Sequence, residues 1–340
     1  MSEFAESAAA PAEKKAMPIV VLVIGMAGAG KTTVMHRLNL HMEENEKRGY
    51  YINLDPAVRD VPFAANIDIR DTVNYKEVMK QYGLGPNGGI LTSLNLFATR
   101  FDQVVNILEK RSDELDYIFI DTPGQIESFT WSAGGQIIHE LLATAFPTVI
   151  MYVTDTPRCS SPTTFMSNML YASSVLYKSQ LPMVCVFNKI DVCPCDFAIE
   201  WMRDFESYQA ALDADAHGGS GNGDSGEGYM SSLNRSLSLA MDEFYSNIKA
   251  VGVSAATGEG VERLFECFDE SAVEFQEEYL PELLKRLNAR SEADKARQEH
   301  DLARLQKDLN ANKGDRVVVD ARAREEGAIV QGEEDDEEEE

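Results

Sequence analysis

Short apolar runs recur along the chain, and longer stretches with a helical spacing of apolar residues separate them. Six runs are rich in β-branched residues: 18–25, 50–55, 117–122, 148–155, 182–191 and 248–255. Because they are apolar throughout and do not alternate, they are typical of parallel strands that are buried on both faces. Helical stretches such as 31–45 and 161–178 lie between them. This alternation predicts a doubly wound α/β fold with a mostly parallel sheet.

The same pattern divides the chain into four parts. We expect a disordered arm over 1–17, an α/β domain over 18–280, a charged helix over 281–312 and a disordered acidic tail over 313–340. Within the domain, residues 213–228 are rich in Gly, Ser and Asp. Such a segment cannot bury a core, so it predicts a flexible surface loop.

Charge and cysteine content narrow the possible classes of protein. The chain has 340 residues and a net charge of −26, and eight acidic residues among the last ten leave roughly −18 for the body. Phosphate backbones would repel such a body, so we expect no direct nucleic-acid binding. We also expect no membrane span and no secretory signal, because no apolar run is long enough. The five cysteines form no CxxC pair, which favours reduced thiols in a cytoplasmic or nuclear protein.

The first apolar run ends in Gly-Met-Ala-Gly-Ala-Gly-Lys-Thr, residues 25–32, and a helical stretch follows at once. Glycines at this place let backbone N–H groups wrap around phosphates, and the start of the helix adds a favourable dipole. We expect Lys31 to reach the β- and γ-phosphates and the Thr32 hydroxyl to bind Mg²⁺. Met26 stands where MinD-type ATPases usually carry a lysine, which disfavours an ATPase of that class. The predicted phosphate-binding residues are Gly28, Ala29, Gly30, Lys31, Thr32 and Thr33.

Carboxylates end two further apolar runs. Asp121, in Asp-Thr-Pro-Gly, is placed to hold Mg²⁺ through water, and the Gly124 N–H to sense a γ-phosphate. Asp55 ends the second run, where it could orient or deprotonate the attacking water; a turn or helix-capping role is the alternative. Gln125 could position water or be an ordinary amide of a switch loop. These residues predict a metal site made of Thr32, Asp55 and Asp121.

The fifth run ends in Asn-Lys-Ile-Asp, which points to recognition of a base. The Asp191 carboxylate can accept from both N1–H and N2–H of guanine, and adenine has no such pair of donors. Asn188, Lys189 and Asp191 therefore predict GTP over ATP. The last run ends in Ser254 and Ala255, where a backbone N–H can meet guanine O6. A nucleotide or polynucleotide kinase shares the phosphate loop but rarely needs to recognise guanine.

These motifs, in this order, resemble the GPN-loop GTPase family, part of the wider class that contains the signal-recognition and MinD-type NTPases. The resemblance covers roughly residues 18–280 and includes NLDPAV, DTPGQIE and FNKID as well as Gly-Pro-Asn at 85–87. On composition alone, residues 84–97 predict a tight turn followed by an apolar run. The resemblance implies that the Gly-Pro-Asn loop lies at a dimer interface, where Asn87 would reach the phosphates bound by the partner.

The resemblance also implies a biological role, because eukaryotic members act in the assembly and nuclear import of RNA polymerase II with a second GPN-loop paralogue. We therefore expect an Mg²⁺-dependent GTPase that pairs with a paralogue or with itself, binds polymerase subunits and shuttles between cytoplasm and nucleus. The alternative is a binding or chaperone module in which GTP stabilises a dimer and hydrolysis is incidental. The expected catalytic residues are Asp55, Asn87, Lys31 and Gln125.

Overall fold

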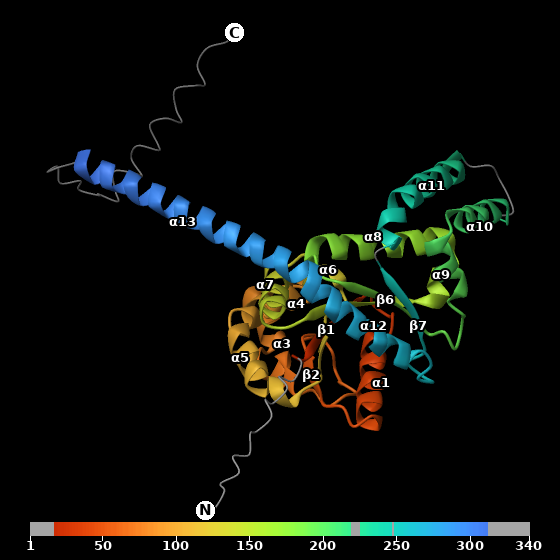
Figure 1. Cartoon of the computed structure of the whole chain (residues 1–340), viewed down its shortest axis with the longest axis horizontal. Coiled ribbons are helices and arrows are strands. Elements are labelled where there is room, and N and C mark those ends of the chain that lie inside the picture. Colours follow the sequence, from red (N-terminus) through yellow and green to blue (C-terminus); the bar gives the residue numbers. More distant parts are fainter. Residues whose placement is uncertain (1–16, 219–224, 247, 312–340) are drawn as a thin grey trace, which may run out of the picture. The chain divides into compact units, whose positions relative to one another are not determined.

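The computed structural model describes residues 17–218, 225–246 and 248–311, and a parallel sheet forms its centre (Figure 1). Within these residues the sheet has seven strands in the order β3-β2-β4-β1-β5-β6-β7, and every pair is parallel. The strands are β1 Ile19–Gly25, β2 Gly49–Asn53, β3 Ile67–Asp68, β4 Tyr117–Asp121, β5 Thr148–Asp155, β6 Met183–Asn188 and β7 Lys249–Val253. The predicted doubly wound α/β fold is confirmed. The sequence pattern did not predict β3, because a two-residue strand has no periodicity.

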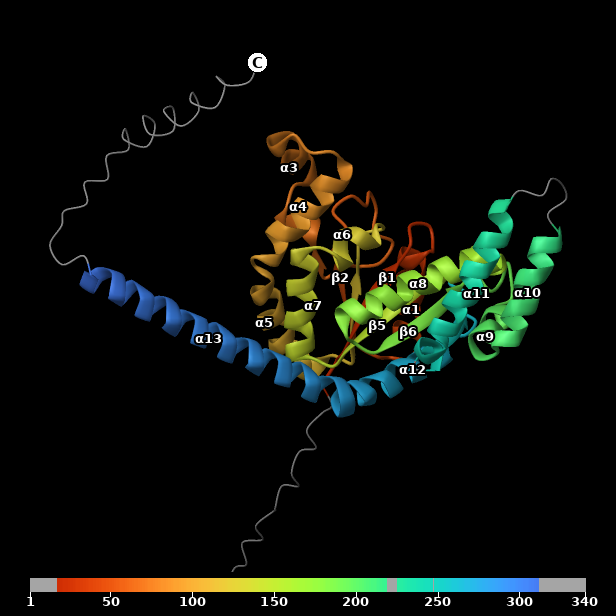
Figure 2. The same ribbon diagram turned by 90° about the horizontal axis from the view of Figure 1, so that it is seen from above.

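Helices connect the strands and cover both faces of the sheet (Figure 2). Their bounds are α1 Lys31–Glu44, α2 Ile69–Thr72, α3 Tyr75–Tyr82, α4 Pro86–Ala98, α5 Phe101–Arg111, α6 Ile126–Thr130, α7 Ala133–Ala145, α8 Pro162–Ser179, α9 Asp196–Arg203, α10 Phe205–Gly218, α11 Ser225–Ser246, α12 Val261–Glu274 and α13 Leu280–Ala311. Short turns of helix are η1 Ser112–Glu114, η2 Thr156–Ser160 and η3 Phe275–Tyr279.

The core is built from opposite faces of the same strands. On one face α1 and α12 pack through Leu38 and Phe268 into a cluster that includes Val184 and Val186 of β6. Phe187, the next residue of β6, points the other way because side chains alternate along a strand. There its ring stacks on Phe165 of α8, with 6.5 Å between the ring centroids. Both faces are therefore covered, as the continuous apolar strands require.

The Gly-Pro-Asn segment differs from the predicted tight turn, because it begins a helix. Gly85 is the N-cap of α4 and Pro86 is its first residue, a position that suits the fixed φ of proline and its missing N–H. Gly89 allows α3 and α4 to pack closely: a Cβ atom there would lie 2.5 Å from Met79 Cγ and 2.8 Å from a Tyr75 ring carbon. Asn87 is thus held at the exposed start of a helix.

The predicted flexible loop over 213–228 is shorter in the structure. Helix α10 continues to Gly218 and α11 begins at Ser225, and residues 219–224 lie outside the described residues. Asp213, inside the predicted loop, forms an ion pair with Arg235 of α11. The Ala and Asp residues at 213–216 are compatible with a helix, so composition overestimated the length of the loop.

The chain divides into two units, residues 1–283 and 284–340. The predicted arm over 1–17 and tail over 313–340 fall, apart from Met17, outside the described residues. In the second unit the described chain is the larger part of α13, whose side chains are nearly all exposed, including Leu284 and Leu302. Among the residues that the structure describes, no helix combines the length and apolar character that a membrane crossing needs.

Candidate nucleotide-binding site

The predicted phosphate loop lies between β1 and α1 at the carboxyl edge of the sheet. Strand β1 lies between β4 and β5, so the connections on its two sides run in opposite directions and leave a crevice there. Gly28 and Gly30 have φ of +83° and +92°, a region that other residues rarely adopt. A Cβ atom at Gly30 would lie 2.5 Å from Asn188 Nδ2. The glycines are therefore required both by conformation and by close packing.

Lys31 is buried in this loop and its ammonium group binds the loop itself. Its Nζ donates to the Gly25 carbonyl at 2.8 Å and to the Met26 carbonyl at 3.4 Å. Burial lowers the pKa of Lys31, while the nearby carboxylates of Asp121 and Asp55 raise it. A phosphate group bound in the loop would add negative charge next to this buried ammonium and so favour its charged form.

Thr32 and Asp121 form a polar pair that suits a divalent cation. The Thr32 hydroxyl donates to Asp121 Oδ2 at 3.3 Å, while Asp121 Oδ1 is buried and has no hydrogen-bond partner within the described part of the chain. Burial raises the pKa of Asp121 to about 7; Lys31 lowers it and the Asp55 carboxylate raises it. The described residues contain no group of three acidic, His or Cys side chains that could hold a metal unaided. The pair fits a cation that also takes ligands from phosphate oxygens.

Asp55 lies near enough to Lys31 and Asp121 to influence the pKa of both. Its Oδ1 also accepts the Ala57 N–H at 2.9 Å, so the alternative turn role is present as well. The side-chain amide of Asn53 fixes the loop by accepting from the Asp55 N–H at 3.1 Å and donating to the Asp55 carbonyl at 3.3 Å. The two roles are compatible, because Oδ1 forms the turn and Oδ2 accepts no hydrogen bond from the residues that the structure describes.

Sequence reasoning missed the side chains that support this loop. Asn53 Nδ2 donates to Asp68 Oδ1 at 3.1 Å, and Arg70 binds both oxygens of Asp68. Arg70 also donates to the carbonyls of Val58 and Arg59 at 3.3 and 2.8 Å. The polar residue Asn53 at the end of an apolar strand was the feature of the sequence that could have predicted this support. Arg70 therefore stabilises the loop that carries Asp55, through Asp68 and through the carbonyls of Val58 and Arg59.

Residues 122–125, between β4 and α6, form the switch segment, which contacts both the phosphate loop and the start of α4. A Cβ atom at Gly124 would lie 4.0 Å from the Ala27 Cβ, so the two loops are adjacent. Gln125 Nε2 donates to Asn87 Oδ1 at 3.0 Å within the same chain. The expected contact between Asn87 and a partner's phosphates stays a prediction. This hydrogen bond links the Gly-Pro-Asn helix to the switch segment.

The base-binding residues meet at the ends of β6 and β7. Asn188 Nδ2 donates to the Ala29 carbonyl at 2.8 Å, and its Oδ1 accepts from the Lys189 and Ala255 N–H groups at 2.8 and 3.2 Å. The Ser254 hydroxyl donates to Asp191 Oδ1 at 2.6 Å, which orients that carboxylate. These contacts bring together the motifs that the sequence kept far apart.

Three predicted residues and one that the sequence did not reveal complete the site. Ala29 is buried in the phosphate loop, and Thr33 is exposed in the first turn of α1. Lys189 has φ of +70°, and its Nζ donates to the Gly28 carbonyl at 3.0 Å and to Asp155 Oδ2 at 2.8 Å. Sequence reasoning missed Asp155, although its position at the end of β5 was a signal.

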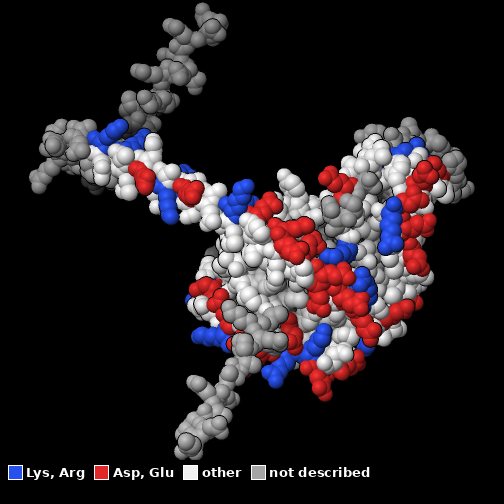
Figure 3. All heavy atoms as spheres, viewed as in Figure 1, with Lys and Arg blue, Asp and Glu red and all other residues white. Residues whose placement is uncertain are grey.

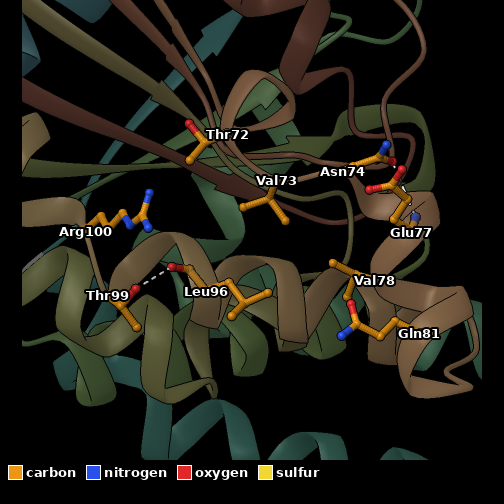
Figure 4. A pocket seen from close by; sticks show the side chains of 9 residues that line it. All are labelled: Thr72, Val73, Asn74, Glu77, Val78, Gln81, Leu96, Thr99 and Arg100. Atoms are coloured by element: carbon orange, nitrogen blue, oxygen red, sulfur yellow. Dashed lines mark hydrogen bonds between the residues drawn. The ribbon is translucent and has the colours of Figure 1, made fainter.

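A pocket of about 310 Å³ lies at the other end of the α3–α4 hairpin (Figure 4). The residues that line it are Thr72, Val73, Asn74, Glu77, Val78, Gln81, Leu96, Thr99 and Arg100. Thr99 is twelve residues beyond Asn87 along α4, which at 1.5 Å per residue places it about 18 Å away. The pocket is therefore separate from the nucleotide site.

Comparisons with known proteins show what this chain resembles. A family model described as a conserved hypothetical ATP binding protein matches residues 23–274. The chain is 54% identical over 303 residues to a protein named GPN-loop GTPase 1 from Dictyostelium discoideum, covering 89% of this chain and 74% of that one. It is 55% identical over 294 residues to GPN-loop GTPase 1 from Saccharomyces cerevisiae, covering 86% and 76%.

A solved structure extends the likeness to the fold. The crystal structure of PAB0955, a GTPase in apo form from Pyrococcus abyssi, superposes with a TM-score of 0.63 at 25% identity, covering 74% of this chain and 97% of that one. The family description names ATP, whereas the named relatives and the Asn-Lys-Ile-Asp motif agree on guanine. The chain belongs to the GPN-loop GTPase family.

Proposed function

We propose that this GTPase hydrolyses GTP with the help of Mg²⁺ held by Thr32 and Asp121. The metal ion, when bound, would neutralise charge on the β- and γ-phosphates. Lys31 would leave its own loop carbonyls and bind the same phosphates. Asp55 would orient the attacking water and accept its proton, using the oxygen that is not engaged in its turn. The observation that carries this proposal is the proximity of Asp55 to the Lys31 and Asp121 side chains.

The base site supports GTP as the substrate. Asp191 is oriented by Ser254, and Asn188 connects the phosphate loop to the last loop of the sheet. Asp191 would accept from the two N–H groups of guanine. The Ala255 N–H, which donates to Asn188 Oδ1 in this structure, would be shared with guanine O6. Occupation of the base site would therefore reinforce the phosphate loop through Asn188.

We also propose that the protein works in pairs, with a GPN-loop paralogue or a second copy. Paralogues exist in the family: a protein named GPN-loop GTPase 3 from Kluyveromyces lactis is 32% identical over 174 residues. Asn87 is exposed at the start of α4, where it can reach another chain. In a pair, Asn87 would exchange its bond to Gln125 for contacts with the phosphates of the partner, leaving Gln125 free to position water.

The proposed biological role is assembly and nuclear import of RNA polymerase II, with movement between cytoplasm and nucleus. The family resemblance supports this role, and so does the charge of the chain. Acidic side chains gather over α12 in Figure 3, where Glu262, Glu266 and Glu270 follow one exposed stripe. Such a surface favours a basic protein client over a nucleic acid.

The test is a pull-down from extract with two baits, Asp55→Ala loaded with GTP and the unchanged protein loaded with GDP. Polymerase subunits and a GPN-loop paralogue that bind one state at least several-fold better would support the proposal. Recovery that is independent of nucleotide would favour the binding module with incidental hydrolysis. Absence of polymerase subunits from both baits would overturn the proposed client.

A further inference from the structure

An arginine that belongs to none of the nucleotide motifs lies beside the phosphate loop. Arg158 is in η2, immediately after β5, the strand that pairs with β1. A Cβ atom at Gly28 would have Arg158 Nη2 and Nη1 as its nearest neighbours, at 3.7 and 3.8 Å. The guanidinium group is therefore beside the middle of the loop, although Arg158 lies 130 positions after Gly28 in the sequence.

A buried carboxylate holds this arginine in place. Asp155 Oδ2 forms an ion pair with Arg158 Nε at 3.4 Å and accepts a hydrogen bond from Lys189 Nζ at 2.8 Å. Lys189 in turn donates to the Gly28 carbonyl at 3.0 Å, so both cations adjoin the same glycine. Because Arg158 uses Nε for the carboxylate, its two Nη groups are the ones that lie next to Gly28.

The charges of this cluster suit an anion. Two cations share one carboxylate, so the cluster carries a net charge of about +1 next to N–H groups that already favour phosphate. The Arg158 side chain is 68% exposed and the Asp155 side chain only 10%, so the arginine keeps access to a ligand while its anchor stays fixed. The two Nη groups of Arg158 take no part in the ion pair with Asp155, and a guanidinium group can bind phosphate oxygens in a bidentate manner through such groups.

We propose that Arg158 binds the phosphates of the bound guanine nucleotide in its own chain, and that Asp155 positions it. Asp155 also holds Lys189 of the base motif, so the same carboxylate couples the phosphate and base subsites. The proposal rests on a guanine nucleotide occupying the site described above. An ordinary exposed ion pair would instead contribute little to any property of the protein.

The experiment compares guanosine, GMP and GDP binding to the unchanged protein, Arg158→Ala and Arg158→Lys by calorimetry at low and high salt. Loss of charge-assisted hydrogen bonds should weaken GDP binding to Arg158→Ala by about 10- to 100-fold. Guanosine binding should stay the same, GMP should be intermediate or unchanged, and GDP binding should depend less on salt. Arg158→Lys should recover part of the loss, because it keeps the charge without the fork.

The matched control is Arg263→Ala, which removes another exposed arginine that pairs with carboxylates on its own helix. It should bind GDP as the unchanged protein does. The proposal is overturned if Arg158→Ala binds GDP as tightly as the control, or if it loses guanosine and GDP equally. Failure of the unchanged protein to bind GDP would instead refute the nucleotide site as a whole.

Discussion

The buried carboxylate of Asp121 should make the nucleotide-free protein less stable as pH rises. Asp121 is 4% exposed. Among the residues described by the structure, its Oδ1 has no hydrogen-bond partner and the Thr32 hydroxyl is the only side chain that donates to its Oδ2. Burial raises its pKa from 3.8 to about 7, with Lys31 opposing and Asp55 adding to the shift. The perturbation is Asp121→Asn, which keeps the shape of the side chain and removes its charge.

The pH dependence of the free energy of unfolding follows from the difference in the pKa of Asp121 between the folded and unfolded states. The pKa of the folded state is above that of the unfolded state, so the stabilisation is fully present below the unfolded pKa and is lost as pH rises through about 7. One pKa unit corresponds to about 1.4 kcal/mol, so Asp121 contributes a change of about 1.4 kcal/mol between pH 6 and pH 8. The protonated carboxyl group is the stabilising form.

The assay is urea unfolding at pH 6, 7 and 8 without nucleotide and with a chelator present. The unchanged protein should lose about 1.4 kcal/mol more stability over this range than Asp121→Asn does. Comparing the two proteins cancels the titration of groups elsewhere. Equal pH dependence in both would refute the assignment of a raised pKa to Asp121.

Three further predictions concern the loop, the base and the support of Asp55. Gly30→Ala should abolish nucleotide binding, because φ at Gly30 is +92° and an added Cβ atom would lie 2.5 Å from Asn188 Nδ2. The control is Gly83→Ala, where φ is +63° and no atom of the described residues beyond its chain neighbours lies within 4 Å of the added Cβ. It should lower the stability of the fold by only about 1–2 kcal/mol through backbone strain. Equal loss of GDP binding in both would contradict the packing argument. Asp191→Asn should move preference from GTP toward xanthosine triphosphate, measured by competition, and intact GTP affinity would show the base assignment to be wrong. Asn53→Ala removes the hydrogen bonds that fix the Asp55 loop and should lower GTP turnover at unchanged GDP affinity; turnover equal to that of the unchanged protein would count against a positioning role.

Much of the fold was predictable because its signals are local. Continuous apolar runs predicted six strands, and the glycines between a strand and a helix predicted the phosphate loop. The Gly-Pro-Asn segment was predicted wrongly as a tight turn, since proline and glycine also suit the first turn of a helix. The close packing of Gly89 against α3, which accompanies this helix, is not visible in any local pattern.

The predicted site residues lie together, whereas the residues that hold them in place could not be predicted from the sequence. Asp68 and Arg70 reach Asp55 through Asn53 only because the short strand β3 pairs with β2. Asp155 and Arg158 meet the phosphate loop because β5 lies next to β1. Contacts of this kind depend on strand order, and a single sequence gives no spacing that reveals it.

The most direct test of the account is single-turnover release of phosphate from bound GTP, with Mg²⁺, by the unchanged protein and by Asp55→Ala. The account predicts that Asp55→Ala still binds GTP and that its rate falls about 10²- to 10⁴-fold, the usual contribution of a general base. A rate that Asp55→Ala retains would contradict the account and leave a module that binds GTP and hydrolyses it only incidentally.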